Sequence, residues 1–256
     1  MLNNSVRILD FDGSITDFAA LPMTPISLEK SPIVFFDFDN TVTMRDVLDD
    51  MLERFSMDQA WKVLEEQWEK GQISTLECLA GQVGVLRITK KDLDMYLSTV
   101  DLDTYFKKLL SWLDSLHVKA VILSDNFDYI VKRILENHGI KNLPVFANRL
   151  EFDQNRLIPR FPFQSSECKA CAHCKRNTLL HNMNGDSVSI YVGDGLSDVC
   201  PARCADVVFA KDALLSYLKK HDIPHIPFNT LKDVQLHLKS SFATAPPAQE
   251  AVANPR

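Results

Sequence analysis

The chain has 256 residues, of which 46% are hydrophobic and 24% are charged, as in ordinary globular proteins. Its formal net charge of −6 argues against a general nucleic-acid binder or a membrane-surface protein. No window approaches the roughly 18 apolar residues of a transmembrane helix. The N-terminus lacks the basic and apolar stretches of a secretory signal, so we expect a cytoplasmic protein.

Two copies of one motif lie near the start of the chain. Residues 6–16 and residues 34–43 both contain an apolar run followed by Asp-x-Asp-x-(Ser/Thr)-(Ile/Val)-Thr. The second copy follows the stronger apolar run and leads into helical patterns. The first leads into a segment with three prolines, which forbid a long helix. The second copy is therefore the better candidate for catalysis.

The first copy contains Asp10 and Asp12, which we predict to be dispensable for turnover. Its Asp-Gly-Ser sequence favours a turn, so the first interpretation is an edge strand with a turn. A remnant of local duplication and a separate small site are the second and third interpretations.

The pattern of strands and helices predicts an α/β protein. Residues 33–38 form an unbroken apolar run rich in β-branched and aromatic residues, as in a buried parallel strand. Residues 127–139 have a helical pattern that ends at Gly139. Such alternation implies a Rossmann-like parallel sheet flanked by helices. Further strands are predicted at residues 118–123, 187–192, 205–210 and 223–228.

One segment interrupts the alternation. Between Met44 and Ser115 the sequence shows only amphipathic helical patterns, which indicate an all-helical cap domain inserted after the first core strand. The tail is rich in Ala and Pro, has little to bury and is expected to be disordered. The predicted organisation is an N-terminal extension (1–32), a core (33–43 and 116–239), a helical cap (44–115) and a disordered tail (240–256).

Polar residues follow the predicted core strands at their carboxyl ends, where open parallel sheets bind ligands. Three acids gathered there would repel one another unless a cation lies among them, and carboxylate oxygens suit Mg²⁺. A serine and a lysine nearby suit a phosphate dianion, and a helix that begins at the lysine adds a favourable dipole. With no Ser-His or Cys-His pair in view, the nucleophile would be a carboxylate that forms an aspartyl-phosphate. The residues are Asp37, Asp39 and Thr41 after 33–36, Ser124 after 118–123, Asp194 and Asp198 after 187–192, and Lys175.

These motifs, "DFDNTVT", "ILSDN", Lys175 and "VGDGLSD", resemble the four motifs of the haloacid dehalogenase-like (HAD) phosphatases. The helical insert resembles the phosphoserine phosphatase-like subgroup. The stretch from "YVGDG" to "LKDV" is most similar to the methionine-salvage phosphatases that act on 2-hydroxy-3-keto-5-methylthiopentenyl-1-phosphate. The cysteine-rich run before Lys175 also resembles phosphoethanolamine/phosphocholine phosphatases.

The resemblance implies a role for each matching residue. Asp37 would be the nucleophile, and Asp39 would protonate the leaving alcohol and then activate water. Mg²⁺ would be held by Asp37, the backbone carbonyl of Asp39, and Asp194, with Asp198 as a ligand or an indirect support. Phosphate would be bound by Thr41, Ser124, Asp125, Asn126 and Lys175. Many relatives have Gly-Gly where this chain has Asp125 and Asn126, so these two positions beside the substrate depart from the pattern.

Three cysteines, Cys168, Cys171 and Cys174, form a Cys-x-x-Cys-x-x-Cys run. They are a possible second metal site, with His173, Cys200 or Cys204 as a further ligand, although structural zinc sites usually use two separated pairs. A loop of thiols beside the active site is the favoured interpretation.

The sequence thus predicts a phosphomonoester hydrolase acting on a small phosphorylated metabolite, with no nucleic-acid or membrane partner and a monomeric or homodimeric state left open. A phosphotransferase and a non-catalytic phosphometabolite-binding regulator are the alternatives. The tryptophans Trp61 and Trp68 are expected to pack within the cap. The candidate substrate-reading residues of the cap are Arg45, Glu53, Arg54 and Arg87.

Overall fold

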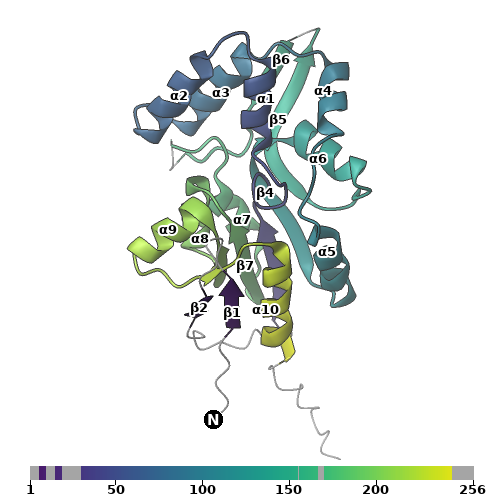
Figure 1. The fold of residues 1–256 in the computed structure, drawn as a ribbon, viewed down its shortest axis with the longest axis vertical. Coiled ribbons are helices and arrows are strands. Elements are labelled where there is room, and N and C mark those ends of the chain that lie inside the picture. Colours follow the sequence, from purple (N-terminus) through teal and green to yellow (C-terminus); the bar gives the residue numbers. More distant parts are fainter. Residues whose placement is uncertain (1–5, 10–14, 19–29, 155, 167–169, 244–256) are drawn as a thin grey trace, which may run out of the picture.

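The core of the protein is a seven-stranded, mostly parallel sheet (Figure 1), seen in a computed structural model that describes residues 6–9, 15–18, 30–154, 156–166 and 170–243. The strand order is β6-β5-β4-β3-β7-β8-β9, and only β5 and β6 pair antiparallel within it. This arrangement confirms the predicted α/β class. The strands are β3 (Ser31–Phe36), β4 (Lys119–Phe127), β5 (Val145–Asp153), β6 (Arg156–Arg160), β7 (Ser187–Gly193), β8 (Val207–Ala210) and β9 (Ile226–Pro227).

Strand β3 is buried on both faces of the sheet. Val34 and Phe36 belong to one hydrophobic cluster, and Ile33 and Phe35 belong to another. Successive strand residues point to opposite faces, which explains why the apolar run is unbroken. Helices α5 (Phe106–Ser115), α6 (Asp128–Asn137) and α10 (Leu231–Ala243) contribute to the first cluster, and α7 (Lys175–Asn182), α8 (Val199–Ala202) and α9 (Asp212–Lys220) to the second.

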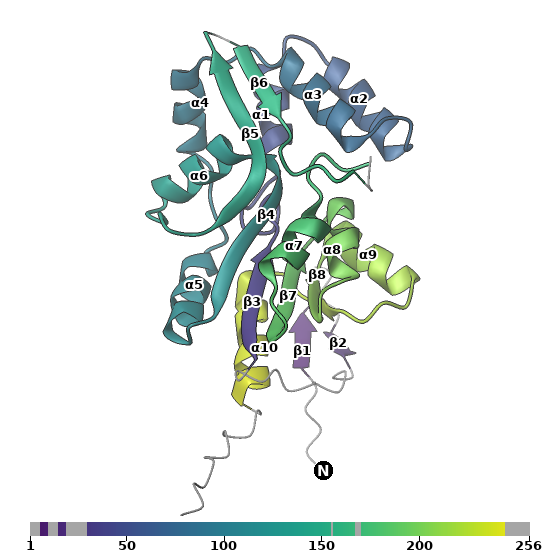
Figure 2. The ribbon, with the colours of Figure 1, turned by 180° about the vertical axis from the view of Figure 1, so that it is seen from behind.

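The hairpin of β5 and β6 was not predicted. Strand β5 mixes apolar and charged residues because its first part pairs with β4, whereas its second part continues beyond the parallel sheet and pairs with β6. Its sequence therefore lacks the continuous apolar run of a buried parallel strand. The hairpin extends towards the helices that follow β3 (Figure 2), where β6 contacts α3.

The segment between β3 and β4 is helical, as expected. Its helices begin at polar caps: Asp46 accepts a hydrogen bond from Asp49 N, and Ser74 forms a reciprocal capping box with Glu77. Helix α5 packs on β4 and α10 instead of joining the other four. We therefore propose a cap shorter than residues 44–115. It comprises α1 (Val47–Phe55), α2 (Ala60–Glu69), α3 (Thr75–Val85) and α4 (Lys90–Leu97).

The first motif copy is not part of the main sheet. Strands β1 (Val6–Leu9) and β2 (Ile15–Phe18) pair antiparallel in a separate two-stranded sheet. Asp10 and Asp12 lie outside the described residues. At the other end, residues 240–243, expected to be disordered, form the last turn of α10, and the rest of the expected tail lies outside the described residues.

Across the described part of the chain, every helix is too short or too polar to span a lipid bilayer.

Candidate active site

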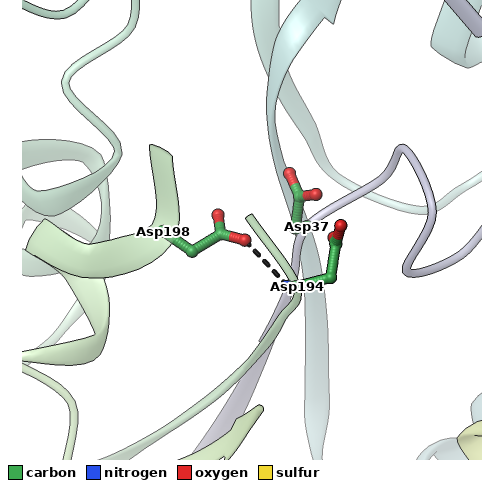
Figure 3. A group of neighbouring side chains, drawn as sticks. All are labelled: Asp37, Asp194 and Asp198. Atoms are coloured by element: carbon green, nitrogen blue, oxygen red, sulfur yellow. Dashed lines mark hydrogen bonds between the residues drawn. The ribbon is translucent and has the colours of Figure 1, made fainter. Parts of the chain in front are cut away.

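Three buried carboxylates meet at the carboxyl ends of the central strands (Figure 3). Asp37 directly follows β3, Asp194 directly follows β7, and Asp198 ends the short 3₁₀ turn η1 (Leu196–Asp198). One oxygen of each lies within 4.8 Å of the others. The parallel pairing of β3 with β7 brings the two strand ends together, because Phe36 lies opposite Val192.

A tight turn after β3 orients the remaining motif residues. The carbonyl of Phe38 accepts hydrogen bonds from Val42 N (2.8 Å) and Thr43 N (2.9 Å). Asn40 has a φ of 55°, a left-handed conformation that Asn tolerates better than most residues. The turn leaves the Asp39 carboxylate beside the first residue of α1, where Val47 N donates to its Oδ1 at 2.9 Å.

Lys175, the first residue of α7, joins two of the acids. Its Nζ donates to Asp37 Oδ1 at 2.6 Å and to Asp198 Oδ1 at 2.8 Å. It also contacts Ser197 Oγ at 3.1 Å, and the side chain is 2% exposed. Burial would lower the pKa of Lys175, but Asp198 and Asp37 outweigh it and hold the pKa above its ordinary value. The lysine is therefore a fixed positive charge.

Both oxygens of Asp198 are fully engaged within the protein. Oδ1 accepts from Lys175 and from the Tyr191 hydroxyl at 2.7 Å. Oδ2 accepts from the backbone amides of Asp194 (3.0 Å) and Gly195 (3.1 Å). Asp198 therefore orients the lysine and the turn, and it has little capacity left to bind a cation directly. The sequence predicts only that Tyr191 lies in a strand, because nothing in a buried strand marks one hydroxyl as functional.

The acids carry more negative charge than the site neutralises. When ionised, Asp37, Asp194 and Asp198 carry three negative charges against one ammonium group, which leaves two in excess. Burial, followed by the charge of Asp198, raises the pKa of Asp37 well above its usual range. The same two causes raise the pKa of Asp194 to about 6. A cation bound among these carboxylates would favour their ionised forms and lower both pKa values.

The residues expected to bind phosphate have different surroundings. Thr41 donates from Oγ1 to Asp194 Oδ1 at 2.7 Å, so it supports an acid instead of facing the cavity. Ser124 Oγ accepts from Asn126 N at 3.0 Å, and no acceptor among the described residues takes its hydroxyl hydrogen. The Asp125 carboxylate lies 3.8 Å from Lys175 Nζ, and its negative charge does not suit a phosphate oxygen. Asn126 donates to Asp39, as described below.

A cavity of about 250 Å³ lies between these groups and the cap helices. One side of the cavity includes Asp37, Asp39, Lys175 and Asp194. The opposite wall comes from α1, α2 and α3 and combines acidic, apolar and amide side chains, a composition that sequence patterns did not indicate. It comprises Asp46, Leu48, Asp49, Glu65, Trp68, Thr75, Cys78, Leu79 and Gln82.

Comparison with known proteins agrees with this geometry. A family model described as "Putative Phosphatase" matches residues 32–217, which include every residue named in the site. The chain belongs to this family. It is similar to the 2-hydroxy-3-keto-5-methylthiopentenyl-1-phosphate phosphatases of Geobacillus thermodenitrificans (27% identical, covering 83% of this chain and 97% of that protein) and Bacillus cereus strain ATCC 14579 (26%, covering 80% and 95%).

Solved structures show the same fold at low identity. A phospho-aspartyl intermediate analogue of phosphoserine phosphatase superimposes with a TM-score of 0.63 at 18% identity, covering 82% of this chain and 99% of that one. An HAD family hydrolase from Salmonella enterica gives 0.65 at 18%, covering 81% and 70%. The protein is a phosphatase with an HAD-like fold, as its motifs predicted.

The cysteine run of the phosphatase does not form a metal cluster among the described residues, and Cys168 lies outside them. Cys174 is buried. His173, considered as a further ligand, is buried with both ring nitrogens engaged: Nδ1 with Ser124 O (2.9 Å) and Nε2 with Thr178 Oγ1 (2.8 Å). It ties the end of β4 to the helix that carries Lys175.

The cap residues expected to read the substrate do not line the cavity. Arg45 and Arg54 both pair with Asp50, and Arg87 donates to backbone carbonyls. Glu53 is also absent from the lining. Trp68, expected to pack within the cap, lines the cavity while its Nε1 donates to Thr75 Oγ1 at 3.0 Å. The helical spacing of Trp68 predicts which side chains share its face of the helix, but it does not predict what that face contacts.

Proposed function

We propose that this phosphatase is a Mg²⁺-dependent phosphomonoester hydrolase that works through an aspartyl-phosphate on Asp37. The observation that carries the proposal is the buried contact of Asp37 with Lys175 beside Asp194. Burial and Asp198 raise the pKa of Asp37, and the charge of Lys175 opposes them, so the lysine favours the ionised carboxylate that a nucleophile requires.

The donor set suits Mg²⁺, because carboxylate oxygens are its preferred ligands and two negative charges are in excess. Asp37 and Asp194 would hold the ion, together with the backbone carbonyl of Asp39. Asp198 would act indirectly, since its oxygens are engaged by four donors. When bound, the ion would neutralise charge on the transferring phosphoryl group.

The protein groups then have distinct tasks. The Asp37 carboxylate attacks phosphorus while the bond from phosphorus to the alcohol oxygen breaks, and Asp39 gives its proton to that oxygen. Asp39 next takes a proton from the water that attacks the aspartyl-phosphate, which releases inorganic phosphate and restores Asp37. Lys175 supplies positive charge beside the phosphoryl group, and Ser124 supplies a hydroxyl donor.

The first substrate to test is 2-hydroxy-3-keto-5-methylthiopentenyl-1-phosphate, the compound named for the similar Geobacillus and Bacillus phosphatases. The apolar part of the cavity wall, with Leu48, Leu79 and Trp68, suits the methylthio end of such a molecule.

The acidic part of the same wall favours a second candidate, a phosphomonoester whose alcohol carries a positive charge, such as phosphoethanolamine or phosphocholine. Asp46, Asp49 and Glu65 lie there, and Lys175 is the only cationic side chain among the described residues that line the cavity. Burial, then Asp46, raises the pKa of Asp49 to about 7. An ammonium group would relieve this repulsion, and Trp68 offers a cation–π face.

A substrate panel assayed with Mg²⁺ tests the proposal through kcat/KM. If the methylthio compound is the substrate, its kcat/KM exceeds those of phosphoethanolamine, phosphocholine and phosphoserine. If the acidic wall selects the substrate, kcat/KM is highest for phosphoethanolamine and phosphocholine. It is lower for phosphoserine, because the wall repels the carboxylate of that substrate. A flat profile contradicts both assignments, and hydrolysis that persists undiminished in a chelator contradicts the metal dependence.

One substitution separates the two candidates further. Glu65→Gln should lower kcat/KM for the ammonium substrates by about tenfold and leave that for the methylthio compound unaffected. Glu66→Gln is the matched control, because Glu66 lies on the same helix but is exposed and pairs with Lys70.

A further inference from the structure

The end of β4 places a buried amide against the proposed acid–base residue. Asn126 Nδ2 donates to both oxygens of Asp39, each at 3.1 Å, and Asn126 is 3% exposed. The pairing of β4 with β5 shifts register between Leu123 and Phe127, and Asn126 lies within this irregular stretch. Irregularities of this kind redirect side chains near active sites.

The orientation of the Asn126 amide is fixed by its neighbours. Its Oδ1 accepts from Phe127 N at 2.7 Å, and a backbone N–H can only donate, so the oxygen must face Phe127. The NH₂ group then has to face Asp39. In addition, Asn126 N donates to Ser124 Oγ at 3.0 Å.

The two oxygens of Asp39 are not equivalent. Oδ1 accepts from Val47 N at 2.9 Å as well as from Asn126, whereas within the described residues Oδ2 accepts from Asn126 alone. A proton on Oδ2 can therefore take an unused lone pair and displaces no hydrogen bond, whereas a proton on Oδ1 would displace one. Asn126 retains its bond to Oδ1 when Oδ2 is protonated. Oδ2 is accordingly the oxygen suited to carry the transferable proton.

We infer that Asn126 is a positioning residue that orients the Asp39 carboxylate so that Oδ2 transfers its proton to the leaving alcohol and later accepts one from water. The inference rests on the role proposed for Asp39. Neither proton transfer moves the two oxygens of Asp39, so the Asn126 amide orients the carboxylate in both steps.

The test compares leaving groups in the full-length enzyme with Asn126→Gly. The parameter kcat/KM covers only the steps up to release of the alcohol. An alkyl phosphate needs a proton on its leaving oxygen, whereas p-nitrophenyl phosphate releases a stable phenolate without one. We expect Asn126→Gly to lower kcat/KM for the best alkyl phosphate of the panel by about 10- to 100-fold, and that for p-nitrophenyl phosphate by less than about threefold.

Two further variants make the result specific. Asn148→Ala is the control for loss of a buried amide, because Asn148 donates to Asp125 O at 2.7 Å and does not contact Asp39. This variant should change kcat/KM by the same factor for both substrates. Asn126→Ser repeats the test with a smaller cavity should the glycine variant fold poorly. Equal losses for both substrates in the Asn126 variants, or no loss, would overturn the inference.

Asp39→Asn distinguishes failure of this inference from failure of the proposed function. It should discriminate between the two leaving groups more strongly than Asn126→Gly does. If Asp39→Asn shows no discrimination, the acid role of Asp39 is wrong, and the positioning role falls with it. If Asp39→Asn discriminates and the Asn126 variants do not, only the inference about Asn126 is wrong.

Discussion

Replacing Asp37 by Asn should reduce kcat by on the order of 10⁴-fold or more, because the substitution removes the only group proposed to attack phosphorus. Fold and cavity should be preserved, since Asn has nearly the same shape and Lys175 keeps its hydrogen bond to Asp198. The measurement is steady-state phosphate release on the best substrate of the panel, with Mg²⁺ present.

Asp10→Asn is the control for this variant, because Asp10 occupies the same place in the first motif copy. We expect its activity to equal that of the unmodified enzyme. Strands β1 and β2, which lie on either side of Asp10 in the sequence, form a separate two-stranded sheet, whereas Asp37 and Asp194 follow β3 and β7 of the main sheet. If Asp37→Asn hydrolyses the substrate as fast as the unmodified enzyme does, or if Asp10→Asn loses activity, the assignment of the two copies is reversed.

Replacing Lys175 by Met should lower the free energy of unfolding by about 3–5 kcal/mol, because breaking a buried ion pair leaves uncompensated charge. Asp37 and Asp198, both buried, lose hydrogen bonds of 2.6 Å and 2.8 Å. Denaturant unfolding in the presence of a chelator measures this effect without a contribution from bound cations.

A double variant checks the cause of the destabilisation. Adding Asp37→Asn to Lys175→Met removes one of the carboxylates that the lysine neutralises, so the double variant should recover part of the lost stability. If the free energy of unfolding of Lys175→Met lies within about 1 kcal/mol of that of the unmodified enzyme, the ion pair contributes much less to stability than a buried pair of this geometry should.

The central strands and their catalytic ends were predictable from sequence, because both depend on local rules. The apolar run before Asp37 has to be a strand buried on both faces, and Asp194 follows a second such run. Parallel strands place their carboxyl ends at one edge, so acids that follow them have to meet. The meeting of Asp37 and Asp194 therefore follows from the order of motifs along the chain.

Other features depend on contacts that no local pattern encodes. The resemblance predicts that Asn126, two residues after Ser124, binds phosphate. In the structure it lies in the stretch of β4 where the register shifts, and its amide donates to Asp39. Likewise, Asp49 and Glu65 lie on separate helices and share a wall only after α1 and α2 pack over the core. The β5–β6 hairpin is not predicted because β5 leaves the parallel sheet, so its sequence mixes apolar and charged residues.

The central claim is that catalysis passes through a phosphorylated Asp37, and trapping that species tests it most directly. The enzyme would be mixed with a ³²P-labelled substrate and Mg²⁺, quenched in acid within milliseconds, digested and mapped by mass spectrometry. We predict acid-stable, base-labile label on the peptide that contains Asp37, and none in Asp37→Asn. Label on another residue, label that survives in Asp37→Asn, or turnover without any labelled protein would contradict the proposed mechanism.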